Sequence, residues 1–294
     1  MLKEFIELAR PHQYIKNVFV FLPAFFAFKL HHIQVIFTAG ITFAAFCLAA
    51  SGVYIFNDWI DRYDDQKHPE KCHRPLASGQ IQSSQALICA TLFFLPGAIV
   101  IAAFAGPMVL SLLVLYIILN IAYSLNLKNQ PIIDITCISL GFVIRLLAGA
   151  KATNVLLSHW IIIMTFLLAL FLSLAKRRDD ILIYNTTNNQ TRKVIGGYNL
   201  KFLDASIIMT GSITILAYIL WSISPSVMAK LTSPNLFLTS IFVFLGVLRY
   251  MQIAFVEEKS GNPTKILLQD VFIQLTLIGW LGSFFWIIYI DVFF

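Results

Sequence analysis

Residues 34–65 read QVIFTAGITFAAFCLAASGVYIFNDWIDRYDD, a long apolar run that ends in a cluster of aspartates. On a helix, steps of three and four residues stay on one face, so Asp58, Asp61 and Asp65 form a stripe. Asp64 turns off that face. Aligned carboxylates at a membrane edge are costly unless a cation binds there, and oxygen ligands suit Mg²⁺, which shares its positions with waters and phosphates. The stretch therefore predicts a metal–diphosphate site at a membrane surface; the alternative is a solvated helix end without a ligand.

The composition indicates a membrane protein. The chain is 59% hydrophobic and 12% charged, with a mean hydropathy of +0.80, whereas soluble domains carry about 25% charged residues. Since a membrane span needs roughly 20 apolar residues, we predict an all-α integral membrane protein with nine transmembrane helices in one domain over 1–294. The expected spans are 15–30, 34–60, 83–105, 107–125, 131–150, 157–178, 201–223, 234–254 and 270–292. Residues 1–14 mix apolar and charged side chains, which predicts an amphipathic helix on the membrane surface, not a cleavable signal peptide.

The basic residues predict the orientation. With the N-terminus inside, seventeen of the 21 lysines and arginines lie on inside segments and three on outside segments. Positive charge favours the cytoplasmic side, so we expect a cytoplasmic N-terminus and cytoplasmic polar loops at 61–82 and 177–200. Positive charge on that face can meet lipid headgroups or phosphorylated substrates. No basic segment stands free of the membrane to bind nucleic acid. A transporter would instead hold its charged residues near the middle of the bilayer.

A second charged cluster reads Lys176-Arg177-Arg178-Asp179-Asp180, at the expected cytoplasmic end of the sixth span. Lys176 and Asp180 are four residues apart and share a helix face. A topology anchor would not need two aspartates, and a metal site would not favour three bases. The mixture predicts a phosphate-rich substrate with a metal on one part and bare phosphate on another, the alternative being a salt-bridged helix end. Which of Asp179 and Asp180 faces the site depends on the helix rotation and stays open.

Single polar residues complete the set of candidates. Arg74 carries five fixed donors that suit phosphate oxygens, although it could equally be a base that sets topology. Lys16 opens the first expected span, and Lys128 follows the fourth, shortly after Tyr123. Arg145 lies well within the fifth span. A charged residue there is a functional candidate by default, but pairing with backbone carbonyls is at least as good an explanation.

The motif Asn57-Asp58-x-x-Asp61-x-x-x-Asp65, followed by Arg74-Pro75, resembles the first aspartate-rich motif of the UbiA-type prenyltransferase superfamily. Further stretches share the resemblance, namely Arg10-Pro11-x-Gln13-Tyr14-x-Lys16-Asn17, Tyr123-Ser124-x-x-Leu127-Lys128, Asp134-Ile135, Gly141-Phe142-x-x-Arg145, Ala175-Lys176-Arg177 and Asn262-Pro263 with Asp270. The resemblance covers nearly the whole chain. It implies a UbiA-like bundle of nine transmembrane helices with a Mg²⁺–diphosphate site on the cytoplasmic side.

The second cluster departs from the common pattern of that superfamily. Its prenyl-transferring members have a second Asp-x-x-x-Asp motif, where this chain has Lys176-x-x-x-Asp180. That substitution resembles a branch which transfers phosphoribosyl groups. It implies phosphoribosyl pyrophosphate as donor and a polyprenyl phosphate as acceptor, in the cell (inner) membrane with a cytoplasmic active site. Transfer of a prenyl chain from prenyl diphosphate to an aromatic acceptor is the alternative. The oligomeric state is open.

The resemblance also implies roles for individual residues. The expected catalytic residues are Asp58, Asp61, Asp65, Lys176 and Asp180, of which the first three would be the metal ligands. The expected substrate-binding residues are Lys16, Asn57, Arg74, Tyr123, Lys128 and Arg177. Lys176 and Arg177 would take the 5-phosphate of the sugar. Many members place the Tyr and Lys of the fourth helix four residues apart, but Tyr123 and Lys128 are five apart, so which of them faces the site is open.

Overall fold

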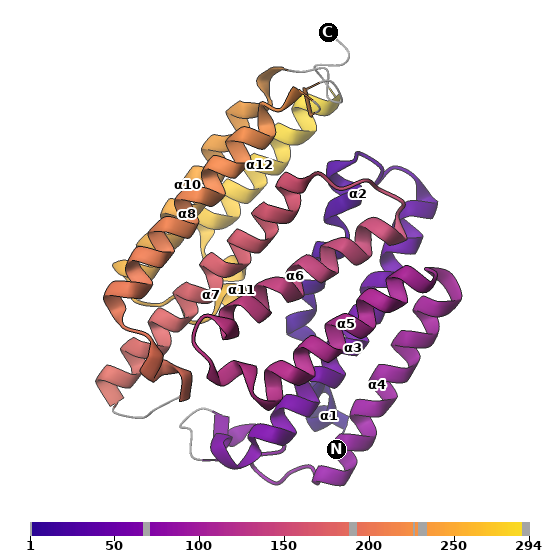
Figure 1. Cartoon of the computed structure of the whole chain (residues 1–294), viewed down its shortest axis with the longest axis vertical. Coiled ribbons are helices and arrows are strands. Elements are labelled where there is room, and N and C mark those ends of the chain that lie inside the picture. The colour runs from indigo at the N-terminus through magenta and orange to yellow at the C-terminus, as the bar shows by residue number, and fades with distance from the viewer. Residues whose placement is uncertain (1, 67–70, 188–192, 226, 229–233, 290–294) are drawn as a thin grey trace. The chain divides into compact units, whose positions relative to one another are not determined.

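The computed structural model describes residues 2–66, 71–187, 193–225, 227–228 and 234–289, and every regular element in these ranges is helical (Figure 1). The α-helices are α1 (Leu2–Ala9), α2 (Leu22–Phe26), α3 (Ile33–Asp65), α4 (Ser83–Phe104), α5 (Pro107–Leu125), α6 (Ile133–Ala152), α7 (His159–Thr187), α8 (Leu200–Ser222), α10 (Ser240–Phe255), α11 (Pro263–Gln269) and α12 (Val271–Tyr289). The 3₁₀ helices are η1 (Pro11–Val20), η2 (Lys71–His73), η3 (Leu127–Asn129), η4 (Lys193–Gly197) and η5 (Pro234–Thr239). The chain divides into two compact units, residues 1–157 and 158–294.

Helix α3 is central to the first unit. It packs along α4 and also contacts α5, α6 and η1. Small residues allow the close approach of α3 and α4, as in many helix pairs of membrane proteins. A Cβ added to Gly52 would lie 2.7 Å from the ring of Phe94, and one added to Gly97 would lie 3.1 Å from the carbonyl oxygen of Ala45. The buried residues of α3 begin at Ala39 and continue to Asp58 and Asp65, so the packed side of the helix leads to the aspartates at its end.

In the second unit, α7 packs against α8, α8 against α10, and α10 against α12 (Figure 1). Helices α11 and α12 are bent by 78° at Asp270. The Asp270 carboxylate accepts a hydrogen bond from Arg249 Nη2 at 2.7 Å and another from the backbone N–H of Ile273 at 2.9 Å. It thus caps the first turn of α12 and ties it to α10. These contacts hold the bend in place.

Seven helices of the described chain are long and apolar enough to cross a membrane, and the bent α11–α12 pair makes an eighth if it counts as one span. The seven coincide with the expected spans between residues 34 and 254, which confirms those apolar runs as helices. The expected last span, 270–292, corresponds to α12 as far as Tyr289, and residues 290–292 lie outside the described residues. The prediction of nine transmembrane helices is not confirmed.

The difference lies at the N-terminal end. The surface helix expected over 1–14 ends at Ala9, because Arg10 takes a left-handed backbone conformation with φ 54° and Pro11 follows it. Residues 15–30 do not form one long α-helix. They continue a 3₁₀ helix to Val20 and then form the short α2, which has Pro23 in its first turn and is followed by Phe28 at φ 55°. An apolar composition alone does not specify this broken path.

The close approach of α6 to η1 leads to a prediction about stability. A Cβ on Gly149 would lie 2.0 Å from the carbonyl oxygen of Val20, a backbone atom that cannot move aside alone. Gly149→Ala should therefore destabilise the protein by about 1–3 kcal/mol or more. Gly40→Ala in α3 is the matched control, because nothing lies within 4 Å of its added Cβ. Thermal unfolding in detergent measures both, and equal midpoints for the two variants would contradict the packing of α6 on η1.

Candidate active site

The three predicted carboxylates share one face at the end of α3, as the spacing required. Asp58 is 2% exposed and Asp65 is 5% exposed, while Asp61 is half-buried. Asp64 is exposed to solvent. The helix continues unbroken through Asp65, so the geometric part of the prediction is confirmed: one stripe with Asp64 off it.

Each carboxylate of the stripe contacts a basic side chain. Arg10 Nη2 donates to both oxygens of Asp58, at 2.6 and 2.7 Å. Arg74 Nη1 donates to Asp65 at 2.7 Å and to Asp58 at 3.1 Å, so that it bridges the two buried carboxylates. Lys128 Nζ forms an ion pair with Asp61. Arg10, Arg74 and Lys128 therefore balance the three negative charges of the stripe.

Asn57 and Lys128, two of the predicted substrate-binding residues, both contact Asp61. Asn57 Nδ2 donates to Asp61 at 3.1 Å, which places the predicted Asn57 beside the stripe. Lys128 reaches Asp61 from η3, so of the fourth-helix pair it is Lys128 that contacts the carboxylates. Arg10 was missed as a site residue. The stretch that begins Arg10-Pro11 was noted for its resemblance to the family, but its contact with a carboxylate could not be inferred because that partner, Asp58, lies 48 residues away.

The carboxylates of the stripe are of the ligand type that Mg²⁺ prefers. Within the described ranges, no three carboxylate, imidazole or thiol side chains converge closely enough to hold a metal ion. The stripe is therefore not a closed cage made by protein ligands alone. Mg²⁺ typically uses one or two carboxylates together with waters and substrate phosphates. Asp61, which is half-buried and lies between Asp58 and Asp65, fits that open type of site.

Lys16 and Tyr123 form a second polar group in the first unit. Lys16 is half-buried in η1. Burial, followed by the nearby charges of Arg145 and Arg10, lowers the pKa of Lys16 from 10.5 to about 8, and Tyr123 acts in the opposite direction. The two predicted residues thus lie within electrostatic range of one another.

Arg145 lies in α6 and is 5% exposed. Its Nε donates to Asn17 Oδ1 at 2.6 Å, its Nη1 to the carbonyl oxygen of Gly141 at 2.8 Å, and its Nη2 to the hydroxyl of Tyr116 at 2.8 Å. The guanidinium also lies over the rings of Tyr116 and Phe142. One of the two explanations for Arg145 was pairing with backbone carbonyls. This pairing is confirmed for one of its three side-chain nitrogens, Nη1.

The second predicted cluster lies on α7 in the other unit and is organised by ion pairs. Arg177, 1% exposed, donates to Asp180 at 2.6 Å. Arg178, 6% exposed, donates to Asp204 at 2.8 Å and to the carbonyl oxygen of Ala254 at 2.6 Å. Lys176 is half-buried on the same helix. Arg178 is thus committed to helix packing, whereas Lys176, Arg177 and Asp180 remain together as a mixed-charge group.

The structure also separates the two aspartates of this cluster. Asp179 accepts hydrogen bonds from the backbone N–H groups of Gly261 and Ser260, in the loop after α10. The contact is close enough that a Cβ on Gly261 would lie 2.1 Å from Asp179 Oδ2. Asp179 therefore fastens a loop, and Asp180 is the aspartate that pairs with the basic group. This pairing leaves Asp180 as the candidate site residue.

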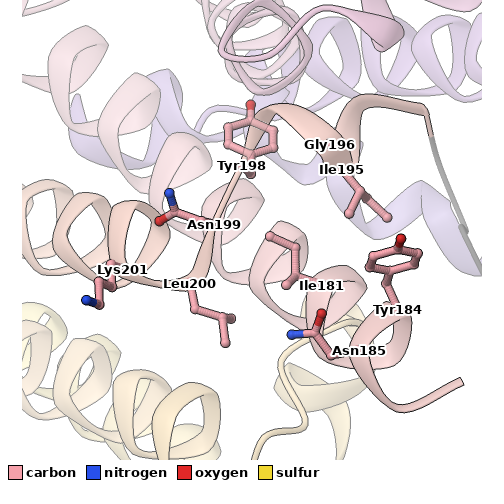
Figure 2. A pocket seen from close by; sticks show the side chains of 9 residues that line it. All are labelled: Ile181, Tyr184, Asn185, Ile195, Gly196, Tyr198, Asn199, Leu200 and Lys201. Atoms are coloured by element: carbon pink, nitrogen blue, oxygen red, sulfur yellow. The ribbon is translucent and has the colours of Figure 1, made fainter. Parts of the chain in front are cut away.

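A cavity of about 430 Å³ lies beyond this cluster, between the end of α7, η4 and the start of α8. Figure 2 shows its lining, in which Ile181, Tyr184 and Asn185 come from α7 and Leu200 and Lys201 from α8. The lining is mostly apolar with one basic residue, and it includes none of the predicted site residues. Its chemistry does not match a phosphate site.

Comparison with known proteins identifies a family and its similar members. Residues 17–275 match the model of the UbiA prenyltransferase family. Two similar curated proteins are both described as decaprenyl-phosphate phosphoribosyltransferase. The one from Corynebacterium glutamicum is 29% identical over 97% of this chain and 86% of its own length, and the one from Mycobacterium tuberculosis (strain H37Rv) is 28% identical over 95% and 92%.

Solved structures show the same fold. A UbiA homolog from Archaeoglobus fulgidus, bound to GPP and Mg²⁺, superposes with a TM-score of 0.72 over 98% of this chain and 100% of that one, at 18% identity. A UbiA homolog from Aeropyrum pernix K1 gives a TM-score of 0.67 over 91% and 97%, at 14% identity. At these identities the similarity concerns the fold alone.

Proposed function

The chain belongs to the UbiA prenyltransferase family, and on that premise we propose that it transfers a 5-phosphoribosyl group from phosphoribosyl pyrophosphate to a polyprenyl phosphate, with Mg²⁺ as cofactor. The observation that carries this proposal is the pairing on α7. A mixed-charge group stands there, made of Lys176, Arg177 and Asp180. Prenyl-transferring members of the superfamily have a pair of carboxylates at this position. The names of relatives that align with about 95% of the chain support the same substrates.

In the proposed reaction, an oxygen of the acceptor phosphate forms a bond to C1 of the ribose. The bond between C1 and the diphosphate oxygen breaks, and the diphosphate leaves with the electron pair. The acceptor is already an anion, so no general base is required. Mg²⁺ bound at the stripe would neutralise charge on the departing diphosphate. Alignment of the two anions and electrostatic preorganisation then supply most of the rate.

The residues of the stripe fit this division of labour. Asp58, Asp61 and Asp65 would hold the metal. Arg74 and Lys128 already contact these carboxylates, so their remaining donors can turn to the oxygens of a diphosphate held beside them. Arg groups recognise phosphates in a fixed two-pronged geometry, and Lys acts as a point charge.

The 5-phosphate of the donor is assigned to Lys176 and Arg177. A guanidinium carries five N–H donors, and the bond from Arg177 Nη1 to Asp180 fixes its plane. Asp180 would then act as a positioning residue for the basic pair. The excess of lysine and arginine on the predicted inside segments supports a multi-pass protein of the inner membrane whose active site faces the cytoplasm.

The test offers purified protein two labelled donor and acceptor pairs with Mg²⁺. One pair is phosphoribosyl pyrophosphate with polyprenyl phosphate, and the other is prenyl diphosphate with an aromatic acid. We expect diphosphate release and entry of labelled sugar into the lipid phase with the first pair. Prenylated aromatic product from the second pair alone would overturn the proposal in favour of prenyl transfer. Omission of Mg²⁺ should abolish turnover, and full activity with chelator would remove the metal from the proposal.

A further inference from the structure

Arg145 is a buried charge without an acidic partner. It is 5% exposed in a helix long and apolar enough to span the membrane. Its three hydrogen-bond acceptors are an amide, a backbone carbonyl and a hydroxyl, and within the described part of the chain no carboxylate contacts it. A buried cation that lacks a counter-ion is costly, and in a membrane span it indicates a functional site. The residues that the structure describes thus leave the positive charge of Arg145 without a counter-ion.

Lys16 adds a second positive charge at the same place. It precedes Asn17, whose side chain is fully buried and accepts the hydrogen bond from Arg145 Nε. The Lys16 side chain forms no hydrogen bond or ion pair with any other described residue. Arg145 is buried and Lys16 is half-buried, and two neighbouring cations repel one another where little water screens them. An anion between them would remove that repulsion.

The scaffold holds this pair in place. The amide of Asn17 donates to Cys47 Sγ at 3.1 Å while its oxygen holds Arg145 Nε. Tyr116 and Gly141 fix the other two nitrogens of the guanidinium. Since a guanidinium has five N–H donors and three bonds are formed within the protein, donors remain for a ligand. The arrangement is a guanidinium held by three hydrogen bonds, with N–H donors to spare, beside a lysine whose ammonium has no hydrogen-bond partner among the described residues.

Arg145 lies deeper along α6 than the residues that meet the carboxylate stripe at the start of that helix. Arg145 is eleven residues after Asp134, which is in the first turn of α6, and this spacing places it about 16 Å along the helix at 1.5 Å per residue. Lys128, in contrast, lies in η3, just before α6 begins, and contacts Asp61 near the end of α3. Arg145 therefore lies deeper in this unit than Lys128 and Asp61, while Lys16 is within electrostatic range of both Arg145 and Arg10, the partner of Asp58.

We infer that Lys16 and Arg145 form the binding site for the phosphate of the lipid acceptor, an inference that rests on the proposed function. A displacement at C1 of the ribose brings nucleophile and leaving group to opposite faces of that carbon. The donor is water-soluble, and its diphosphate is assigned to the stripe at the helix ends. The acceptor is anchored by its hydrocarbon chain, so its phosphate approaches from the membrane side, at the level of Arg145. The Tyr123 hydroxyl, within electrostatic range of Lys16, is available as a further donor.

Lys16→Gln is the first test, because this change removes a charge without breaking a hydrogen bond within the described chain. We expect the KM for polyprenyl phosphate to rise about ten-fold or more, as the loss of a charge-assisted contact predicts, with the KM for phosphoribosyl pyrophosphate within about two-fold of wild type. Lys16→Arg should restore most of the affinity. Arg145→Gln should act in the same direction, and Lys151→Gln, an exposed lysine on the same helix, should change neither constant.

Two results would overturn this assignment. A higher KM for the donor, with the acceptor unchanged, would place the sugar 5-phosphate at this pair, and unchanged constants for both substrates would reduce the pair to a structural role. Direct binding of a short-chain polyprenyl phosphate and of the matching polyprenyl alcohol, without donor, separates this inference from the proposed function. Wild type should prefer the phosphate and Lys16→Gln should lose that preference, even if turnover with phosphoribosyl pyrophosphate failed. Competition by inorganic phosphate alone at equal strength would show a general anion site, and would overturn recognition of the lipid.

Discussion

Asp61→Asn is expected to lower the turnover number on the order of a hundred- to a thousand-fold, the loss typical when one group that stabilises a transition state is removed. Asp61 is the half-buried member of the stripe, between two carboxylates that are bridged by Arg74. The amide keeps the shape of the side chain but removes the charge that would bind Mg²⁺ and hold Lys128. Steady-state turnover with phosphoribosyl pyrophosphate and polyprenyl phosphate measures the effect, together with the Mg²⁺ concentration at half-maximal rate.

Asp64→Asn is the matched control for this variant. Asp64 lies three residues further along the same helix, is exposed, and points off the stripe. The same chemical change there should leave turnover within about two-fold of wild type. Replacement of Asp58 or Asp65 is less informative, because each is buried in an ion pair with an arginine. Its loss would leave the charge of that arginine unpaired and would destabilise the protein. Near-normal turnover of Asp61→Asn would remove the metal–diphosphate role from the stripe.

Lys176→Gln should raise the KM for phosphoribosyl pyrophosphate about ten-fold or more. The reason is the assignment of the 5-phosphate to the basic pair on α7, where Arg177 is oriented by Asp180 at 2.6 Å. A ribosyl pyrophosphate without the 5-phosphate makes the test specific. Wild type should use this analogue at least as poorly as the variant uses the full donor, because the analogue loses the contacts of both Lys176 and Arg177. Wild type and variant should have similar KM values for the analogue.

The control for this pair is Lys201→Gln, an exposed lysine at the start of α8. It should leave both KM values unchanged. If Lys176→Gln weakened the full donor and the analogue equally, the lysine would act on some other part of the substrate, and the 5-phosphate assignment would be wrong. Thermal unfolding in detergent checks that the variant is folded before the constants are compared.

The comparison of sequence and structure separates two kinds of prediction. Local patterns were reliable: the carboxylate stripe, the exposed Asp64 and the helices between residues 34 and 254 follow from periodicity and apolar length, which act along one helix. The region 15–30 was mispredicted as one long helix, because a 3₁₀ helix ends at Val20, a new helix begins at Leu22 with Pro23 in its first turn, and Phe28 takes a left-handed conformation beyond its end. The roles of Asp179 and Asp180 could not be separated until the loop at Gly261 was seen against Asp179.

The sequence by itself determined that this chain is a helical membrane protein with an acidic stripe and a mixed-charge cluster, since the length and spacing of apolar and charged residues are local properties. Only the tertiary structure decided which cation meets which carboxylate. Arg10 reaches Asp58 across 48 residues, Lys128 reaches Asp61 across 67, and Arg145 reaches Asn17 across 128. Such pairs depend on how the helices pack. A charge that is buried by this packing needs a counter-charge. Asp58 has one within the protein, and we infer that Lys16 and Arg145 receive theirs from a ligand.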